Sequence, residues 1–520
     1  MDPEQNNGGS AFHAHCCPCG EYSADGMSRR VFLGGLSGAA LGGVALTGLS
    51  WSVLAAEPPE ERAPSRRPLV VKPVLIYDLP TRRPQTSWRA WGGLQTQADV
   101  DQELARIHRE LDQLCAKADF PVKFLPIAAG RNAQELAPAK DEIASADLTL
   151  LYAAGSHTPA VEMVGKTAKD LIVFCRHKSG PVYLWYEIIS PLYLRQRTDA
   201  LALKKIDDQD IVVDSQDELL WRLRSLCGLH NTIGSRILAV GGPGGWCTPA
   251  APALAKDRFK LDIQTVSYED LGKLIKEARA DHAAVERACR RADAYLKLPN
   301  TTLETERKTV DNAFLLEQIF RSLMKKADCR AMTINGCMSI IMPLSETTAC
   351  LPLSTLNDDG YMAFCESDFV IIPAGMLLRN ISGRPHFMND PTYPHDGVIT
   401  LAHCTGPRKM DGKNAEPVRL LTHFESDYGA APKVEMRKGQ TVTNIVGDFK
   451  AERWMGLRGE IVEAPFLPIC RCQIDIRFQC DSLKLAQQMP GFHWMTCYGD
   501  YLKEVGYALK RTPIQWENLG

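Results

Sequence analysis

Apolar and polar positions alternate with two different periods along residues 69–230, and this pattern defines the first expected domain. Helical spacing of apolar residues is clear at 99–118 and again at 219–229. Short apolar runs typical of buried strands lie between the helical segments, at 70–77, 122–128, 148–153, 171–174 and 182–185. Strands that alternate with helices predict a parallel, doubly wound sheet.

The same alternation continues through residues 231–368 and then stops. This second stretch has expected strands and helices at 236–240, 281–297, 310–326 and 331–337. Beyond it, short strand-like segments separated by turn residues occupy 398–403, 419–423, 434–437, 441–449, 457–462 and 472–478, before a short closing helix at 502–509. We therefore expect an α/β protein in which two doubly wound parallel-sheet domains, 69–230 and 231–368, precede a β-rich, barrel-like C-terminal domain, 369–520.

A glycine cluster at 241–245 directly follows the expected strand at 236–240. Such a loop can bring backbone close to a ligand, but the full dinucleotide-binding fingerprint is absent. We interpret it as a tight turn, with a ligand-binding loop as the alternative.

Residues 1–56 contain a pattern typical of protein export. Arg29 and Arg30 stand side by side before an apolar, glycine-rich run, as in twin-arginine signals. We expect a leader over 1–56, a proline-rich linker over 57–68, recognition by the twin-arginine translocase and a periplasmic location. A retained leader would instead anchor the chain in the membrane, and Met27 is an alternative start.

Composition limits the partners that need to be considered. The chain has 520 residues and a formal net charge of −2, which gives no electrostatic basis for binding nucleic acid or an anionic membrane surface. Its 17 cysteines would favour disulfides in an oxidising compartment. The twin-arginine route carries folded proteins, so we expect mostly free thiols that behave as small buried hydrophobic residues. Those in apolar or strand-like runs are Cys175, Cys337, Cys350, Cys365, Cys404 and Cys497.

Three segments in the later half of the chain, 350–368, 382–407 and 491–500, carry possible metal ligands beside apolar residues. Carboxylates combined with imidazole suit Mn²⁺, Mg²⁺, Co²⁺ or Fe²⁺. Taken singly, a carboxylate is more often a solvated surface group and a histidine more often a hydrogen-bonded core residue. The candidates are Glu366, Asp390, His403 and His493.

Over residues 233–501 these segments resemble the L-fucose isomerase family, especially its branch of L-fucose and L-arabinose isomerase-like proteins. Residues 364–368, Phe-Cys-Glu-Ser-Asp, are similar to the family's Ala-Cys-Glu-x-Asp-like motif, although Phe364 stands where alanine is usual. Asp390 and His493 match the aspartate and the late histidine of the family, the latter before a Tyr-Gly-Asp segment. His403 with Cys404 is similar to its His-Cys motif.

The resemblance implies a metal-dependent aldose–ketose isomerase that acts on a sugar through an enediolate. It implies a divalent metal, foremost Mn²⁺, held by Glu366, Asp390 and His493, with Glu366 and Asp390 as the catalytic pair. It also implies a homo-oligomer in which the first domain of one copy helps to close the site of a neighbour. Further candidates for contact with the sugar are His403, Arg384 and Trp494.

Two other functions fit the same residues. An exported carbohydrate-binding protein would bind the sugar without turnover. A metal-dependent lyase, epimerase or hydrolase would act on modified sugars. The identity of the sugar is left open by the sequence.

Overall fold

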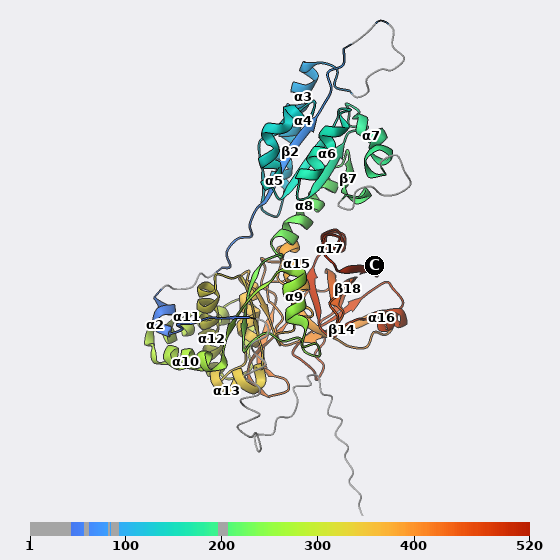
Figure 1. Cartoon of the computed structure of the whole chain (residues 1–520). Helices are drawn as coiled ribbons and strands as arrows, with labels where there is room; N and C mark the ends of the chain where they lie inside the picture. Colours follow the sequence, from blue (N-terminus) through green and yellow to red (C-terminus); the bar gives the residue numbers. More distant parts are fainter. Residues whose placement is uncertain (1–42, 57–61, 82–83, 85–92, 196–205) are drawn as a thin grey trace, which may run out of the picture.

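The computed structural model describes residues 43–56, 62–81, 84, 93–195 and 206–520. Figure 1 shows the first sheet unit at one end of the molecule, and α8 (Gln216–His230) leads from it into a larger body that holds the second sheet and the barrel. Arg29 and Arg30 of the expected export signal lie outside the described residues. Among the residues that are described, no helix is both long and apolar enough to cross a membrane.

The first unit is a parallel sheet with the strand order β3-β2-β5-β6-β7, and β4 also pairs with β2. Its strands are β2 (Leu69–Ile76), β3 (Val122–Phe124), β4 (Ala128–Gly130), β5 (Leu148–Ala153), β6 (Leu171–Cys175) and β7 (Ile211–Val213). Helices cover both faces, which is why β5 and β6 are buried along their whole length. The helices are α3 (Gln97–Lys117), α4 (Ala133–Leu136), α5 (Lys140–Ser145), α6 (Thr158–Thr167) and α8.

Residues 182–185 do not form the expected strand. They lead instead into a short helix, α7 (Leu184–Ile188). The aromatic run at this point has high strand propensity, but the Trp185 side chain is buried and its Nε1 donates a hydrogen bond to the Gly155 carbonyl oxygen. Tertiary packing of one large ring therefore overrides the local preference.

The second unit is also a parallel sheet, with the strand order β1-β9-β8-β11-β12. The strands are β1 (Val44–Ala45), β8 (Arg236–Val240), β9 (Asp262–Val266), β11 (Ala331–Ile334) and β12 (Met362–Phe364). The two parallel sheets together confirm the doubly wound α/β class. The helices of this unit are α9 (Ala251–Phe259), α10 (Tyr268–Ala280), α11 (His282–Leu296), α12 (Arg307–Lys326), α13 (Met342–Ser345), α14 (Cys350–Asp358) and α15 (Ile372–Ser382).

Two elements of the second unit come from within the expected leader. Strand β1 pairs in parallel with β9, and α2 (Trp51–Ala55) follows it. The Trp51 side chain is 4% exposed, its Nε1 donates to Asp281 Oδ2 at 2.9 Å, and its backbone N–H donates to Glu277 Oε2 at 2.7 Å. This segment thus contributes to the main hydrophobic core.

The C-terminal region confirms the expected β-rich barrel. Six antiparallel strands follow the order β17-β20-β13-β14-β19-β18, and pairing of β17 with β18 closes the barrel. Closure leaves no free edge among these strands. They are β13 (Phe387–Pro391), β14 (Val398–His403), β17 (Thr441–Gly447), β18 (Arg453–Glu463), β19 (Cys472–Arg477) and β20 (Trp494–Tyr498). A smaller sheet beside the barrel consists of β10 (Thr301–Leu303), β15 (Val418–His423) and β16 (Tyr428–Val434).

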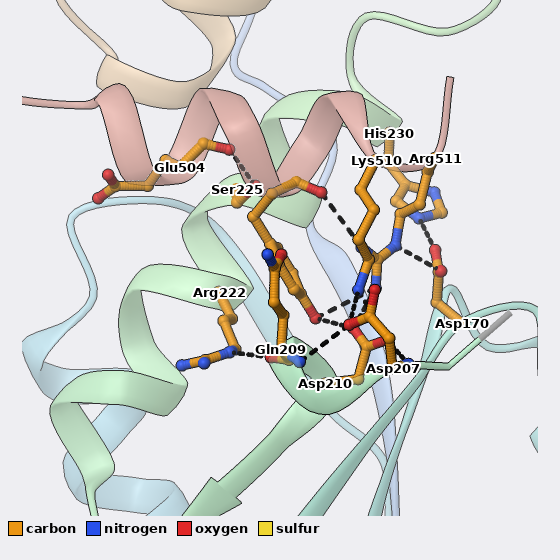
Figure 2. Close-up of polar contacts among 11 residues, drawn as sticks. Asp170, Asp207, Gln209, Asp210, Arg222, Ser225, His230, Glu504, Lys510 and Arg511 are labelled. Atoms are coloured by element: carbon orange, nitrogen blue, oxygen red, sulfur yellow. Dashed lines mark hydrogen bonds and ion pairs between the residues drawn. The ribbon is translucent and has the colours of Figure 1, made fainter. Parts of the chain in front are cut away.

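A cluster of polar contacts joins the end of the chain to the first unit (Figure 2). It follows the expected closing helix, α17 (Leu502–Leu509), which packs against α8. Asp210, which is fully buried, accepts hydrogen bonds from Tyr507 Oη at 2.7 Å, Lys510 Nζ at 2.8 Å and Arg511 Nη2 at 3.0 Å. Arg511 Nε also donates to Asp170 Oδ1 at 2.7 Å. These contacts hold the first unit to the body at α8.

Candidate metal centre

The candidate centre lies where the second sheet meets the barrel. Glu366 follows β12, the last strand of that sheet, while Asp390 belongs to β13 of the barrel. Asn389 pairs with Trp494 across β13 and β20, so Asp390 lies beside His493, which precedes β20. Asp390 also pairs with Ala402 of β14, which places it next to the end of that strand, where His403 stands. Strand pairing thus collects side chains that are far apart in the sequence.

The four side chains point to a common centre. His493 Nε2 is 3.3 Å from Glu366 Oε2 and 3.3 Å from Asp390 Oδ1. His403 Nε2 is 3.7 Å from Glu366 Oε1. Ligand atoms of Asp390, His403 and His493 all lie within 4.8 Å of one another. Ligands about 2.1 Å from one ion are about 3.0–3.5 Å apart, so the two 3.3 Å separations at His493 match the edges of a coordination shell, and the 3.7 Å separation at His403 is slightly wider.

Hydrogen bonds behind the two histidines fix how the rings face the centre. Asp368 Oδ2 is 2.7 Å from His493 Nδ1, so this nitrogen donates to the carboxylate and Nε2 faces Glu366 and Asp390. Thr405 Oγ1 is 3.2 Å from His403 Nδ1. A carboxylate behind a histidine that faces an ion is the usual support for a metal ligand.

Backbone strain accompanies the centre. Glu366, Ser367 and Trp246 adopt positive φ angles of 59°, 50° and 51°. Each such non-glycine residue costs about 1–3 kcal/mol and persists only where the surroundings enforce it. Here the glycine loop does so, because Gly244 N–H donates to the Ser367 carbonyl at 3.1 Å and Ser367 Oγ donates to the Gly242 carbonyl at 2.9 Å.

Two atoms at the centre are buried without a hydrogen-bond partner among the described residues. They are His493 Nε2 and Asp390 Oδ1. A buried polar atom left unpaired costs about 1–3 kcal/mol, so native proteins rarely keep one without a reason. Two such atoms from an imidazole and a carboxylate, aimed at the same point, fit a bound divalent cation.

The charges in the cluster shift the pKa values of its members in different directions. Burial raises the pKa of Asp390 to about 6, although His493 and His403 oppose the rise. Burial also acts against ionisation of Glu366, yet its close contacts with the His403 and His493 rings hold its pKa well below the usual range.

The histidine pKa values move upward. Burial lowers them, but the contacts with Asp368 and Glu366 and the charge of Asp390 together outweigh burial and raise the pKa of His493 well above its usual value. Burial also lowers the pKa of His403, and the contact with Glu366 together with the charge of Asp390 raises it overall. The cluster thus attracts positive charge to its centre, and a metal ion would take the place of the protons.

The structure places the sequence candidates in two groups. Glu366, Asp390 and His493 converge, and His403 joins them at ligand distance rather than standing further out. The other two candidates for contact with the sugar lie elsewhere. Arg384 Nη1 donates to the Tyr498 carbonyl at 3.0 Å, and Trp494 is fully buried in the main core.

Sequence reasoning missed two residues that shape the centre, Asp368 and Trp246. The half-buried Trp246 ring stacks on Phe492, with centroids 4.1 Å apart and planes 5° apart, and meets His493 edge-on at 6.0 Å. The glycine cluster before Trp246 was the available signal. It forms more than a tight turn, because it packs against the segment that carries Glu366.

No protein-family model matches the chain, and no curated protein matches it either.

Proposed function

We propose that this protein is a metal-dependent aldose–ketose isomerase that acts on a sugar. The observation that carries the proposal is the convergence of two carboxylates and two imidazoles on one centre, with His493 Nε2 at 3.3 Å from a carboxylate oxygen on either side. The likeness to the L-fucose isomerase family in these same segments supports the choice of reaction.

The donor set fits a divalent ion of borderline hardness. Two carboxylates and two neutral imidazoles suit Mn²⁺, Fe²⁺ or Co²⁺, and we propose Mn²⁺. Glu366, Asp390, His403 and His493 would hold it. A bound ion would supply the positive charge that polarises two neighbouring oxygens of the open-chain sugar.

The carboxylates have environments suited to proton transfer between the first two carbons of the sugar. Glu366 is held ionised by the two imidazoles, so it is in the unprotonated form that a base requires. Asp390 has a pKa of about 6, raised by burial, so it can hold and release a proton near neutral pH. Two carboxyl groups whose environments move their pKa values apart are a recurring arrangement in acid–base catalysis.

Aromatic rings next to the centre support a sugar substrate. The stacked pair of Trp246 and Phe492 is half-buried and borders His493. Such rings offer a flat apolar surface to the C–H face of a sugar, while the centre contacts its hydroxyl groups. We extend the proposal to a homo-oligomer and to export by the twin-arginine route, as the resemblance and the leader pattern imply.

The test is turnover by the full-length protein loaded with Mn²⁺. A panel of aldoses is incubated with the protein. The products are separated by chromatography, and their masses are measured by mass spectrometry. We expect a ketose of unchanged mass from at least one aldose, and no product with Glu366→Gln, which keeps size but loses the base. Glu269→Gln, an exposed change on α10, is the matched control and should retain activity.

Other outcomes contradict the proposal in distinct ways. A product of altered mass indicates lysis or hydrolysis. Calorimetric binding of a sugar without any product indicates a carbohydrate-binding protein.

A further inference from the structure

A second group of metal-ligating side chains lies behind the candidate centre. Cys350, Cys404 and His423 are all buried, and one ligand atom from each lies within 4.8 Å of the other two. Cys404 also belongs to a neighbouring group with Glu425 and Cys470, whose ligand atoms meet the same limit. Cys404 is therefore the common member of a set that offers three thiols, an imidazole and the Glu425 carboxylate.

These residues come from four separate elements, so their meeting is a product of the fold. Cys350 opens α14, Cys404 directly follows β14, and His423 ends β15. Cys470 lies just before β19. With Ala402 and Ala431, the three cysteines form a small buried cluster of their own, separate from the main core.

Packing alone explains a single buried cysteine, because a free thiol acts as a small hydrophobic group. It does not explain why two thiols, those of Cys350 and Cys404, meet the His423 imidazole while a third, that of Cys470, lies next to Cys404. Polar contacts already orient the ring, with Ser426 Oγ 3.1 Å from His423 Nδ1 and Glu425 Oε2 3.0 Å from Nε2. An ion can replace one of these two contacts at a ring nitrogen of His423. The other contact then keeps the ring in place, as partners of metal-bound histidines do.

We propose that Cys350, Cys404, Cys470 and His423 form a structural Zn²⁺ site. Three cysteines and one histidine are a common closed, tetrahedral zinc set, in which sulfur atoms about 2.3 Å from the ion lie about 3.8 Å apart. Cys404 Sγ already lies within 4.8 Å of a ligand atom of each of the other three residues. The site differs in chemistry from the candidate metal centre, where oxygen ligands favour a harder ion.

The position of Cys404 gives this zinc site a role in the neighbouring centre. Cys404 follows His403 directly, at the end of β14. An ion bound by Cys404 therefore fixes the end of the strand that carries His403. Zinc at this site should survive the loss of Glu366, so the proposal does not depend on isomerase activity.

The test measures metal content in the full-length protein, purified without chelators from medium that contains zinc and copper. Elemental analysis should find about one zinc per chain in the wild type and in Glu366→Gln. Cys404→Ser should lose at least nine-tenths of it. Cys497→Ser is the matched control, because Cys497 is buried in the same barrel outside the cluster, and it should keep its zinc.

A second measurement does not depend on the folding of Cys404→Ser. Wild-type protein grown with Co²⁺ should show a thiolate-to-cobalt charge-transfer band, since cobalt replaces zinc in thiolate sites. Absence of that band, or equal zinc in wild type and Cys404→Ser, overturns the proposal. Copper in place of zinc overturns the choice of ion, and a disulfide found among these cysteines by mass spectrometry overturns the site.

Discussion

A substitution of Asp368 tests whether the hydrogen bond behind His493 supports metal binding at the candidate centre. Among the described residues, its contact with the centre is with His493, and the residue is 1% exposed. Its Oδ2 accepts from His493 Nδ1 at 2.7 Å, and its Oδ1 accepts from the Val370 backbone N–H at 3.0 Å. Both oxygens are thus acceptors in the native fold. The substitution Asp368→Asn keeps the shape but leaves one acceptor.

The carboxamide cannot satisfy both donors. If its oxygen accepts from Val370, its NH₂ group faces His493 Nδ1, and the imidazole moves its proton to Nε2. That proton then occupies the position facing Glu366 and Asp390. Loss of such a carboxylate partner typically lowers metal affinity by about 10–100-fold, or about 1.4–2.7 kcal/mol.

Calorimetric titration of the metal-free protein with Mn²⁺ measures this effect. We expect the dissociation constant of Asp368→Asn to rise by about 10–100-fold, and Glu366→Gln to weaken binding further because it removes a ligand charge. Asp475→Asn is the matched control, because Asp475 in the same barrel accepts from Thr400 Oγ1 at 2.6 Å, a bond that asparagine can also accept. A dissociation constant for Asp368→Asn within twofold of both wild type and the control would refute the argument.

Three further changes test other parts of the structure. Trp51→Ala should lower the free energy of unfolding by about 3–5 kcal/mol in guanidinium titration, since the ring is buried; an unchanged midpoint would exclude α2 from the fold. Burial lowers the pKa of His386 to about 3, so between pH 6.5 and pH 3 this histidine binds a proton only in the unfolded chain. The free energy of unfolding therefore decreases as the pH is lowered. His386→Phe should therefore lose about 2–3 kcal/mol less than wild type between pH 7 and pH 4.5, and equal losses would contradict this. Arg511→Met leaves Asp210 short of one cation and should cost about 3 kcal/mol, seen as faster proteolysis of the first unit; an unchanged rate would count against the contact.

The sequence by itself determined the elements whose pattern is local. The continuous apolar runs of β5 and β6 indicate strands covered on both faces, and the spacing in α3 indicates a helix with one buried side. Short alternating segments after residue 368 indicated the barrel. These features depend on neighbours a few residues apart, so periodicity is enough to find them. The motifs around Glu366, Asp390 and His493 were found as well, and the resemblance, rather than any local pattern, implied that the three residues hold one metal.

Only the tertiary structure decided which of these side chains meet. Asp368 and His493 are 125 positions apart, and their contact depends on how the second sheet packs on the barrel. The same packing brings His403 close to Glu366 and buries Trp494 in the main core. It also brings buried cysteines together with His423 in one cluster. In the sequence, each of these cysteines has only the pattern of a small buried hydrophobic residue. Strand register and the packing of one unit on another depend on residues far apart in the sequence, so local periodicity does not predict them.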